Sequence, residues 1–138
     1  MKVKIEQNGK EGKWGVDISL VRSQTPRNQT EHLFYWHIYY KDRRAGKAYI
    51  NSSTEGAEFV SVFLNKPMQG RGIGGVAFRL ACELSDLPAV YAEVRQSNLP
   101  SQKALRKAGF SLFGRNRSGE DILIWRRQNG SVQRKENL

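Results

Sequence analysis

The first 65 residues alternate apolar and polar positions over short stretches, and a period of two is typical of half-buried β-strands. In the stretch 14–21, for example, Val16, Ile18 and Leu20 fall on one face. We predict five strands in this part of the chain, at residues 2–7, 14–21, 33–41, 48–53 and 58–65. The first two are expected to pair as a β-hairpin. The intervening segments are polar and rich in turn residues, at 8–13, 22–32 and 41–47.

The hydrophobic period changes at residue 73. Apolar residues then recur at helical spacing, at positions 73, 76, 77, 80, 81 and 84, which predicts a helix that Pro88 ends. A second helix is predicted at 98–110, because Pro100 suits a first turn and Gly109 a helix end. Further strands are predicted at 89–95, 110–115 and 121–127. This order of elements predicts an α+β, or mixed α/β, fold.

Composition narrows the class of protein. The 138 residues suit a single domain, which we assign to residues 1–127, followed by a polar tail at 128–138. No apolar run approaches the ~20 residues that span a bilayer, and the first ten residues lack the apolar segment of a secretory signal. A single cysteine, Cys82, excludes an internal disulfide framework. We therefore expect a cytoplasmic protein with no membrane partner.

Four glycines lie between the strand at 58–65 and the helix that follows, in "QGRGIGG" (69–75). The segment matches the dinucleotide fingerprint G-x-G-x-x-G, and Glu93 falls near the place of a ribose-binding acid. Four predicted antiparallel strands precede it, however, and a dinucleotide domain normally begins with its βαβ unit. A P-loop is excluded because Val76 and Ala77 replace the required lysine and hydroxyl. A purely structural turn remains an alternative.

A third pattern fits the same glycines. Residues 69–74 have the form (Gln/Arg)-x-x-Gly-x-(Gly/Ala), which resembles the diphosphate-binding loop of the GNAT family of N-acetyltransferases. Residues 92–110 resemble the second cofactor segment of that family, with Asn98 and Gly109-Phe110 at the matching spacing. The segment "NLPSQKALRKAGF" is most similar to ribosomal-protein-type acetyltransferases. Together these matches cover residues 58–127, about half of the chain.

The resemblance implies a GNAT-like fold, with a central, mostly antiparallel twisted sheet. The strands at 58–65 and 89–95 would run parallel and splay apart. The first two helices of the family would be reduced or missing, because only residues 22–32 are available for them. The implied activity is transfer of an acetyl group from acetyl-coenzyme A (acetyl-CoA) to an amine.

The resemblance also implies which residues hold coenzyme A. Backbone N–H groups at a helix start bind phosphate, and glycine removes the Cβ atoms that would obstruct it. The main chain of Val62 and Leu64 would bind the pantetheine arm within the splay, and Asn98 and Ser101 would face the cofactor from the second helix. The diphosphate loop would comprise Gln69, Gly70, Arg71, Gly72, Ile73 and Gly74.

Glu93 is the candidate general base, because a subset of the family carries a glutamate at this position, five residues before the asparagine. It could instead be a surface carboxylate paired with an arginine. His37, in the middle of an aromatic strand, is a second candidate base, and Glu58 is a poorer one. Cys82 is not expected to act as a nucleophile, because it lies off the apolar helical face and has no flanking histidine. No residue spacing indicates a metal site.

The general acid is not assigned by the sequence. Many family members carry a tyrosine seven residues after the helix asparagine, whereas this chain has Leu105 there. Tyr39, Tyr40 or Tyr49 could donate the proton from another strand. Alternatively no acid is used, since a thiol with a pKa near 8.5 leaves as a thiolate without severe cost.

The net charge of +10 favours an anionic partner. We expect a macromolecular acceptor, either a protein or a nucleic acid, because a short loop at 22–32 would leave the acceptor side open. The segment "YWHIYY" (35–40) lies near basic turns, a mixture found in nucleic-acid contacts. The alternative function is therefore a GNAT-fold protein with altered or lost catalysis that binds or modifies nucleic acid. A homodimer is also left open.

Overall fold

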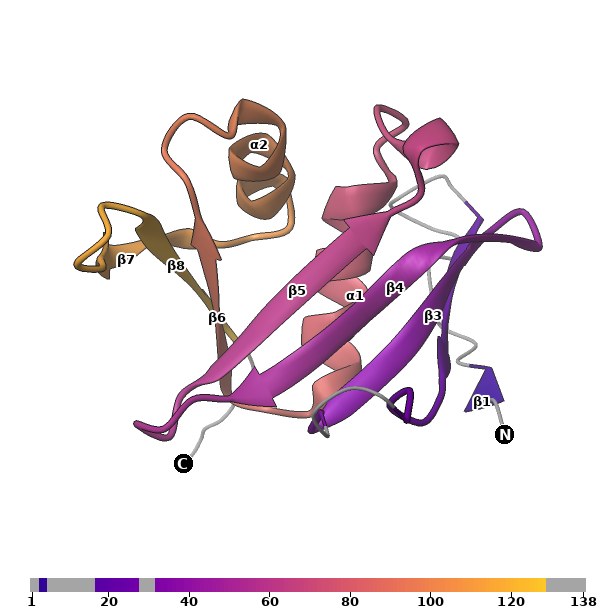
Figure 1. The fold of residues 1–138 in the computed structure, drawn as a ribbon, viewed down its shortest axis with the longest axis horizontal. Coiled ribbons are helices and arrows are strands. Elements are labelled where there is room, and N and C mark those ends of the chain that lie inside the picture. The colour runs from indigo at the N-terminus through magenta and orange to yellow at the C-terminus, as the bar shows by residue number, and fades with distance from the viewer. Residues whose placement is uncertain (1–2, 5–16, 28–31, 129–138) are drawn as a thin grey trace.

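One mixed sheet forms the centre of the computed structural model, which describes residues 3–4, 17–27 and 32–128. Its eight strands lie in the order β1-β2-β3-β4-β5-β6-β8-β7 (Figure 1). All neighbouring strands are antiparallel except β5 and β6, as predicted for a mostly antiparallel α/β fold. The strands are β1 (Val3–Lys4), β2 (Ile18–Arg22), β3 (Phe34–Tyr40), β4 (Arg43–Ser52), β5 (Glu58–Leu64), β6 (Ala89–Val94), β7 (Ser111–Arg115) and β8 (Asp121–Arg126).

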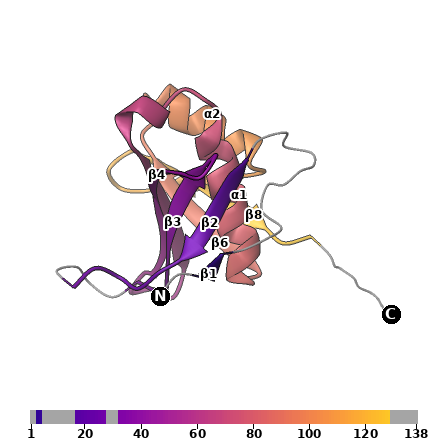
Figure 2. The same ribbon diagram turned by 90° about the vertical axis from the view of Figure 1, so that its right-hand side faces the viewer.

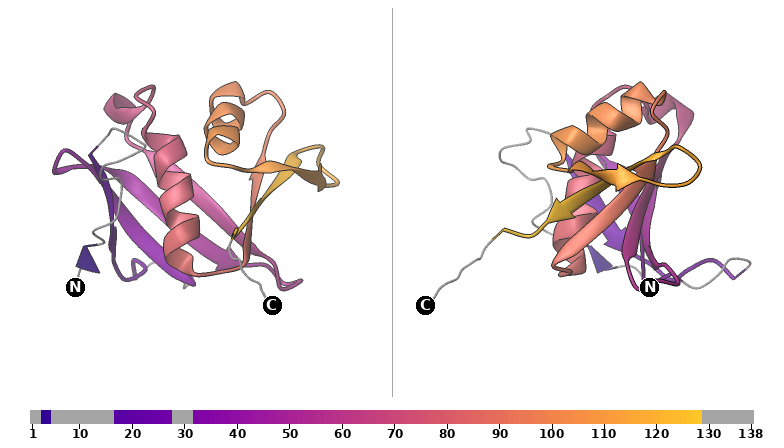
Figure 3. Two further views of the ribbon diagram at one scale, coloured as in Figure 1. Left: turned by 180° about the vertical axis from the view of Figure 1, so that it is seen from behind. Right: turned by 90° about the vertical axis from the view of Figure 1, so that its left-hand side faces the viewer.

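The helices lie on one side of this sheet. Helix α1 (Ile73–Ser85) crosses the sheet face, and α2 (Leu99–Lys107) lies beside it near the end of β6 (Figures 2 and 3). A short 3-10 helix, η2 (Lys66–Met68), leads from β5 toward α1. Among the described residues no helix covers the opposite face, and none is long and apolar enough to span a membrane.

The hydrophobic core lies between α1 and the sheet. The predicted apolar face of α1 is buried, with Ile73, Ala77 and Leu80 at most 2% exposed. It packs on inward-facing strand residues that include Trp36 and Ile50. The period-3.6 pattern therefore identified the correct face of this helix.

Cys82 departs from the prediction, because its side chain is fully buried instead of lying off the apolar face. Arg127, which follows β8, donates hydrogen bonds to the main-chain oxygens of Cys82 (2.9 Å) and Glu83 (3.2 Å). The end of β8 thus lies against the last turn of α1 and widens its buried arc. Burial raises the pKa of the Cys82 thiol, which keeps it protonated and agrees with its exclusion as a nucleophile.

The hairpin between β3 and β4 is tighter than predicted. The sequence indicated a turn over residues 41–47, but the turn is only Lys41-Asp42, with φ of 49° and 67°. Two left-handed residues match the right-handed twist of the flanking strands, so β4 begins at once at Arg43. Arg43 and Arg44 remain exposed at the strand end, which explains why their charge resembled that of a loop.

The N-terminal pairing is antiparallel, as the predicted hairpin requires, with Val3 opposite Arg22 and Lys4 opposite Val21. Strand β2 ends one residue later than the predicted stretch 14–21. Residues 23–27 form no helix, in agreement with the predicted loop. Residues 5–16, 28–31 and 129–138 lie outside the described residues, and with them the predicted turn at 8–13 and nearly all of the tail.

Helix α2 has the predicted start and end signals. The Asn98 side chain caps its N-terminus by accepting a hydrogen bond from the Ser101 N–H (3.2 Å). At the other end Gly109 has a φ of 104°, and the N–H groups of Gly109 and Phe110 bond to the oxygens of Arg106 and Leu105 (both 3.0 Å). This pair of bonds is a Schellman motif, which ends the helix at Lys107.

Asp121 ties α2 to the far edge of the sheet. Its carboxylate accepts hydrogen bonds from Arg115 Nε and from Gln102 Nε2 (both 3.0 Å), and its side chain is largely buried. The hydrogen bond from Arg115, helped by that from Gln102, lowers the pKa of the Asp121 carboxyl. This contact joins β7, β8 and α2 beside the end of β6.

Replacing Asp121 by Asn should lower the thermal unfolding midpoint by a few degrees at pH 7. A lowered pKa contributes stability that is present above the unfolded-state value of about 3.9 and is lost as pH falls through the folded-state value. The gap between wild type and variant should therefore shrink below about pH 4. Melts followed by circular dichroism at several pH values measure both effects. Asp86→Asn, at the exposed left-handed C-cap of α1, is the matched control. An equal loss at pH 7 and pH 3 would exclude the Asp121 charge as the cause.

Candidate active site

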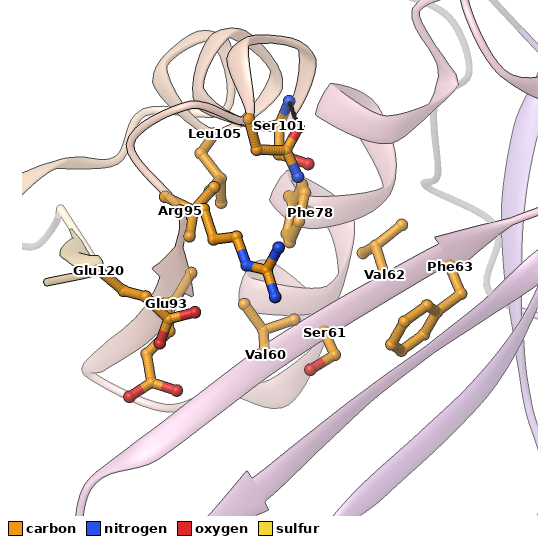
Figure 4. A pocket seen from close by; sticks show the side chains of 13 residues that line it. Val60, Ser61, Val62, Phe63, Phe78, Glu93, Arg95, Ser101, Leu105 and Glu120 are labelled. Carbon is orange, nitrogen blue, oxygen red and sulfur yellow. Dashed lines mark hydrogen bonds between the residues drawn. The ribbon is translucent and has the colours of Figure 1, made fainter. Parts of the chain in front are cut away.

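A cleft of about 340 Å³ opens where β5 and β6 separate (Figure 4). The two strands are parallel but share a single register position, Phe59 opposite Tyr91, which confirms the predicted splay. Beyond it the strands diverge, and side chains from α1 and α2 enter the gap. The lining residues are Val60, Ser61, Val62 and Phe63 on β5, Phe78 on α1, Ala92, Glu93, Val94 and Arg95 at the end of β6, Asn98, Ser101 and Leu105 around α2, and Glu120.

The edge of β5 presents unpaired peptide groups to this cleft. Asn65 N–H bonds to Ala45 O (2.8 Å), and in an antiparallel pair alternate residues point their main-chain groups to the same side. The odd-numbered residues of β5 therefore bond to β4, and Val62 and Leu64 direct their N–H and C=O groups toward the splay. Since β6 pairs no further than Tyr91, these groups have no strand partner there. Val62 lines the cleft with this edge, whereas Leu64 is outside the lining and its oxygen accepts a hydrogen bond from Gln69 Nε2 (3.2 Å); their role in binding stays a prediction.

The glycine-rich loop leads into an uncapped helix terminus. Gly70 and Gly72 have φ of 77° and 80°, and a Cβ at either position would meet no atom within 4 Å. Gly72 is the N-cap of α1, and the first turn carries neither a capping side chain nor an acidic residue. Gly72 is exposed and Gly74 half-buried at this terminus, whereas Ile73 and Gly75 are buried, and the positive end of the helix dipole lies at the same place. Such a terminus is suited to bind an anion.

The later glycines of the same row serve packing. A Cβ on Gly75 would lie 3.3 Å from the main-chain oxygen of Ala104, so Gly75 allows α1 and α2 to approach closely. Gly74 has ordinary contacts with Ala104 and Leu64, at 3.8 Å. The four glycines therefore have two roles. Gly70 and Gly72 allow the left-handed backbone of the loop, whereas Gly74 and Gly75 belong to α1, and Gly75 sets its distance to α2.

The side chains of the loop fold back on the protein. Gln69 Nε2 donates to Leu64 O (3.2 Å), and Arg71 Nε donates to Pro67 O (3.0 Å). Ile73 is fully buried in the core. In this structure Gln69, Arg71 and Ile73 therefore shape the loop with their side chains and leave the main chain to meet a ligand. Their assignment to cofactor binding stays a prediction.

Two carboxylates share one amide at the other wall of the cleft. Asn116 Nδ2 donates to Glu93 Oε2 (3.2 Å) and to Glu120 Oε1 (3.0 Å). Asn116 Oδ1 accepts from the N–H groups of Ser118 and Glu120, which fixes the turn between β7 and β8. Glu93 was predicted, whereas Glu120 and Asn116 were not, because "NRSGE" resembled only a turn. The asparagine at the start of that turn was the available signal.

The other candidates for acid or base lie elsewhere. His37 is on β3, two strands away from β5, and it does not line the cleft. Tyr39, Tyr40 and Tyr49 are on β3 and β4 and are likewise absent from the lining. Leu105 does line it and is 1% exposed. Among the described residues no cluster of His, Cys, Asp and Glu could hold a metal ion.

Several basic and aromatic side chains that resembled a nucleic-acid surface have structural partners. Arg115 binds Asp121, and Arg127 bonds to main-chain oxygens at the end of α1. Trp36 is in the core, whereas Tyr35 lies on the opposite sheet face and stacks with Tyr49. The aromatic side chains of this segment therefore divide between the two faces of the sheet, and two of the nearby arginines bind groups of the protein itself.

Residues 7–110 match the family model described as the Acetyltransferase (GNAT) family, which is more than half of the chain. The chain belongs to the GNAT family. None of the curated proteins that were compared matches its sequence. The match ends at Phe110, where the Schellman motif ends α2, so it includes both the glycine-rich loop and the capped helix.

Solved structures of acetyltransferases share the fold. RimJ of Mycobacterium smegmatis, in complex with CoA-disulfide, superposes with a TM-score of 0.61 at 19% identity, over 69% of this chain and 53% of RimJ. AAC(6')-Ib with ribostamycin and coenzyme A gives 0.58 at 19% identity, over 68% of this chain and 64% of that enzyme. PseH of Campylobacter jejuni gives 0.57 at 13% identity, over 69% and 68%. The chain thus spans about half to two thirds of the length of these proteins.

Proposed function

We propose that this protein transfers an acetyl group from acetyl-CoA to an amine in the cleft between β5 and β6. The observation that carries the proposal is the unpaired edge of β5 at Val62 opposite the Glu93 carboxylate, in one cleft of a GNAT fold. The edge can bind an extended ligand that carries amide groups. The carboxylate can accept a proton from an amine that lies between the two walls.

The described residues fit acetyl-CoA at three places. The N–H groups at the start of α1, next to Gly72, would hold the diphosphate. The main chain of Val62 and Leu64 would bond to the pantetheine amides, although Leu64 O already accepts from Gln69. Asn98 and Ser101 lie in the cleft at the start of α2. When bound, acetyl-CoA supplies an acetyl group activated as a thioester.

Glu93 is the proposed base. An amine attacks only as its neutral form, so the ammonium must first lose a proton to a group within hydrogen-bond reach. Asn116 holds Glu93 Oε2, and no described residue bonds to Oε1, which leaves that oxygen available to take a proton. Glu120 shares the same amide and adds negative charge that would attract a cationic amine.

We propose a macromolecular acceptor. The sheet face opposite α1 carries aromatic rings next to the cleft, with Phe63 51% and Phe113 56% exposed. Tyr91 connects Phe113 to Phe59, with ring centroids 5.2 Å and 5.6 Å apart. An open aromatic surface beside the carboxylates suits a protein segment better than a small enclosed metabolite.

Transfer from labelled acetyl-CoA to a cell lysate, with protein, RNA and small molecules counted separately, tests this choice of acceptor. Label confined to small molecules would contradict a macromolecular acceptor, and label confined to RNA would contradict a protein acceptor.

Glu93→Gln should lower the turnover number about 10²–10⁴-fold, because the amide cannot accept the proton. It should leave the thermal shift caused by coenzyme A nearly unchanged, because Glu93 lies on the wall opposite the β5 edge. Steady-state kinetics and melting with coenzyme A measure the two effects. Glu58→Gln, at the start of β5 and outside the cleft lining, is the matched control. Unchanged turnover in Glu93→Gln would remove Glu93 from this role.

Gly72→Ala should weaken coenzyme A binding at least tenfold, because the new Cβ projects into the open space before α1. The left-handed backbone should also cost about 1–2 kcal/mol of folding stability. Gly56→Ala is the matched control, since Gly56 has a φ of 86° and equally open surroundings in the β4–β5 turn. Calorimetric titration and urea unfolding give the affinity and the stability. Equal affinities in the two variants would show that the loop does not hold the diphosphate.

A further inference from the structure

Arg95 places a positive charge inside the cleft. It follows β6 directly and lines the cleft together with Val60 and Ser61 of β5, and Figure 4 shows its side chain extending into the gap between the two strands. The main chain at this position is fixed, because Arg95 O accepts from Asn98 N–H (3.0 Å) and from Gln102 Nε2 (3.3 Å). These bonds fix the position from which the Arg95 side chain enters the cleft.

The guanidinium has no hydrogen bond or ion pair with any described residue, although two carboxylates line the same cleft. Glu93 and Glu120 instead share the amide of Asn116. A guanidinium carries a permanent positive charge and five N–H donors, and none of the described residues accepts a hydrogen bond from that of Arg95. Such a group is available for a developing anion.

The cleft lacks the proton donor that the resemblance leads one to expect. Leu105 occupies the position of the usual tyrosine and cannot donate. Ser61 and Ser101 contribute hydroxyls to the lining but no charge. A thiol leaving group departs faster if it receives a proton or if its thiolate is stabilised electrostatically, and Arg95 can provide the second.

We propose that Arg95 stabilises the coenzyme A thiolate as the acetyl group is transferred, which removes the need for a general acid. This role rests on the proposed function. The acceptor nitrogen forms a bond to the acetyl carbon, and Glu93 takes the proton of the amine. The carbon–sulfur bond breaks, and its electron pair goes to sulfur beside the guanidinium. The thiolate then leaves and is protonated in solvent, to which Glu93 releases the proton that it accepted.

The proposal predicts a property of the complex without turnover. A neighbouring cation lowers the pKa of a thiol from its usual value of about 8.5. The thiol of bound coenzyme A should therefore titrate below this value in the wild type, as measured by the ultraviolet absorbance of the thiolate. Arg95→Gln should return it toward the value for free coenzyme A, and Arg95→Lys should keep part of the shift. Cys82 gives no competing signal, because burial raises the pKa of its thiol.

Kinetics provide a second readout. Arg95→Gln should lower turnover with acetyl-CoA about 10²–10³-fold, the usual effect of removing one donor from a developing anion. The loss should be smaller with acetyl thioesters of more acidic coenzyme A analogues, whose thiolates need less stabilisation. Arg117→Gln, an exposed arginine outside the cleft lining, should change neither the titration nor the rates.

The outcomes separate this role from the proposed function. If coenzyme A binds both proteins but its thiol titrates identically in the wild type and in Arg95→Gln, the role of Arg95 is wrong and acetyl transfer still stands. If Arg95→Gln raises only the KM for the acceptor, Arg95 binds the acceptor and the proposal is equally wrong. If coenzyme A does not bind the wild type, the proposed function fails and this role fails with it.

Discussion

The early end of the pairing between β5 and β6 is the constraint on which the site depends. Two parallel strands that begin together would normally continue to bond, because an unpaired peptide group is costly when buried. Here Phe78 from α1 and Leu105 from α2 enter the gap, and the contact between Gly75 and Ala104 fixes the distance between the two helices. The packing of α1 on α2 therefore keeps the strands apart. The peptide groups of β5 remain at an open cleft, where a ligand can pair with them.

Local chemistry explains which parts of the fold were predictable from the sequence. Asn98 and Gly109 encode the ends of α2 by capping, which needs only neighbouring residues, and both ends agree with the prediction. Cys82 is buried at a part of α1 that Arg127 contacts, and Arg127 lies 45 residues later, after the return of β8. No helical periodicity contains that information. The two-residue turn before Arg43 was missed for a local reason. Exposed charged residues at a strand end have the same composition as a loop, so the start of β4 was read as part of the turn.

The residues of the site also divide into those predictable from local motifs and those brought in by distant parts of the chain. Motif spacing led to Glu93, Asn98, Ser101 and Val62, all of which line one cleft, because each lies at a fixed offset along β5, β6 or α2. Glu120 reaches the cleft only because β8 pairs with β6 and brings the β7–β8 turn to the end of that strand. The direction of the Arg95 side chain follows from the room left by the splay, and a sequence pattern does not record this room. The sequence motifs thus identified the lining residues that lie on one element or next to it. They missed Glu120 and the direction of Arg95, which depend on how distant elements pack.

Asn116 determines how charge is distributed in the cleft. Glu93 is on β6 and Arg95 follows the strand two residues later. If the two side chains formed an ion pair, the guanidinium would bind the oxygen that must take a proton. Asn116 offers both of its amide hydrogens to Glu93 and Glu120, which draws the carboxylates toward the β7–β8 turn and away from Arg95. One wall then carries the proton acceptors and the space toward β5 carries the cation. This separation suits acetyl transfer, in which the acceptor amine loses a proton to a carboxylate while the sulfur of coenzyme A gains negative charge near the guanidinium.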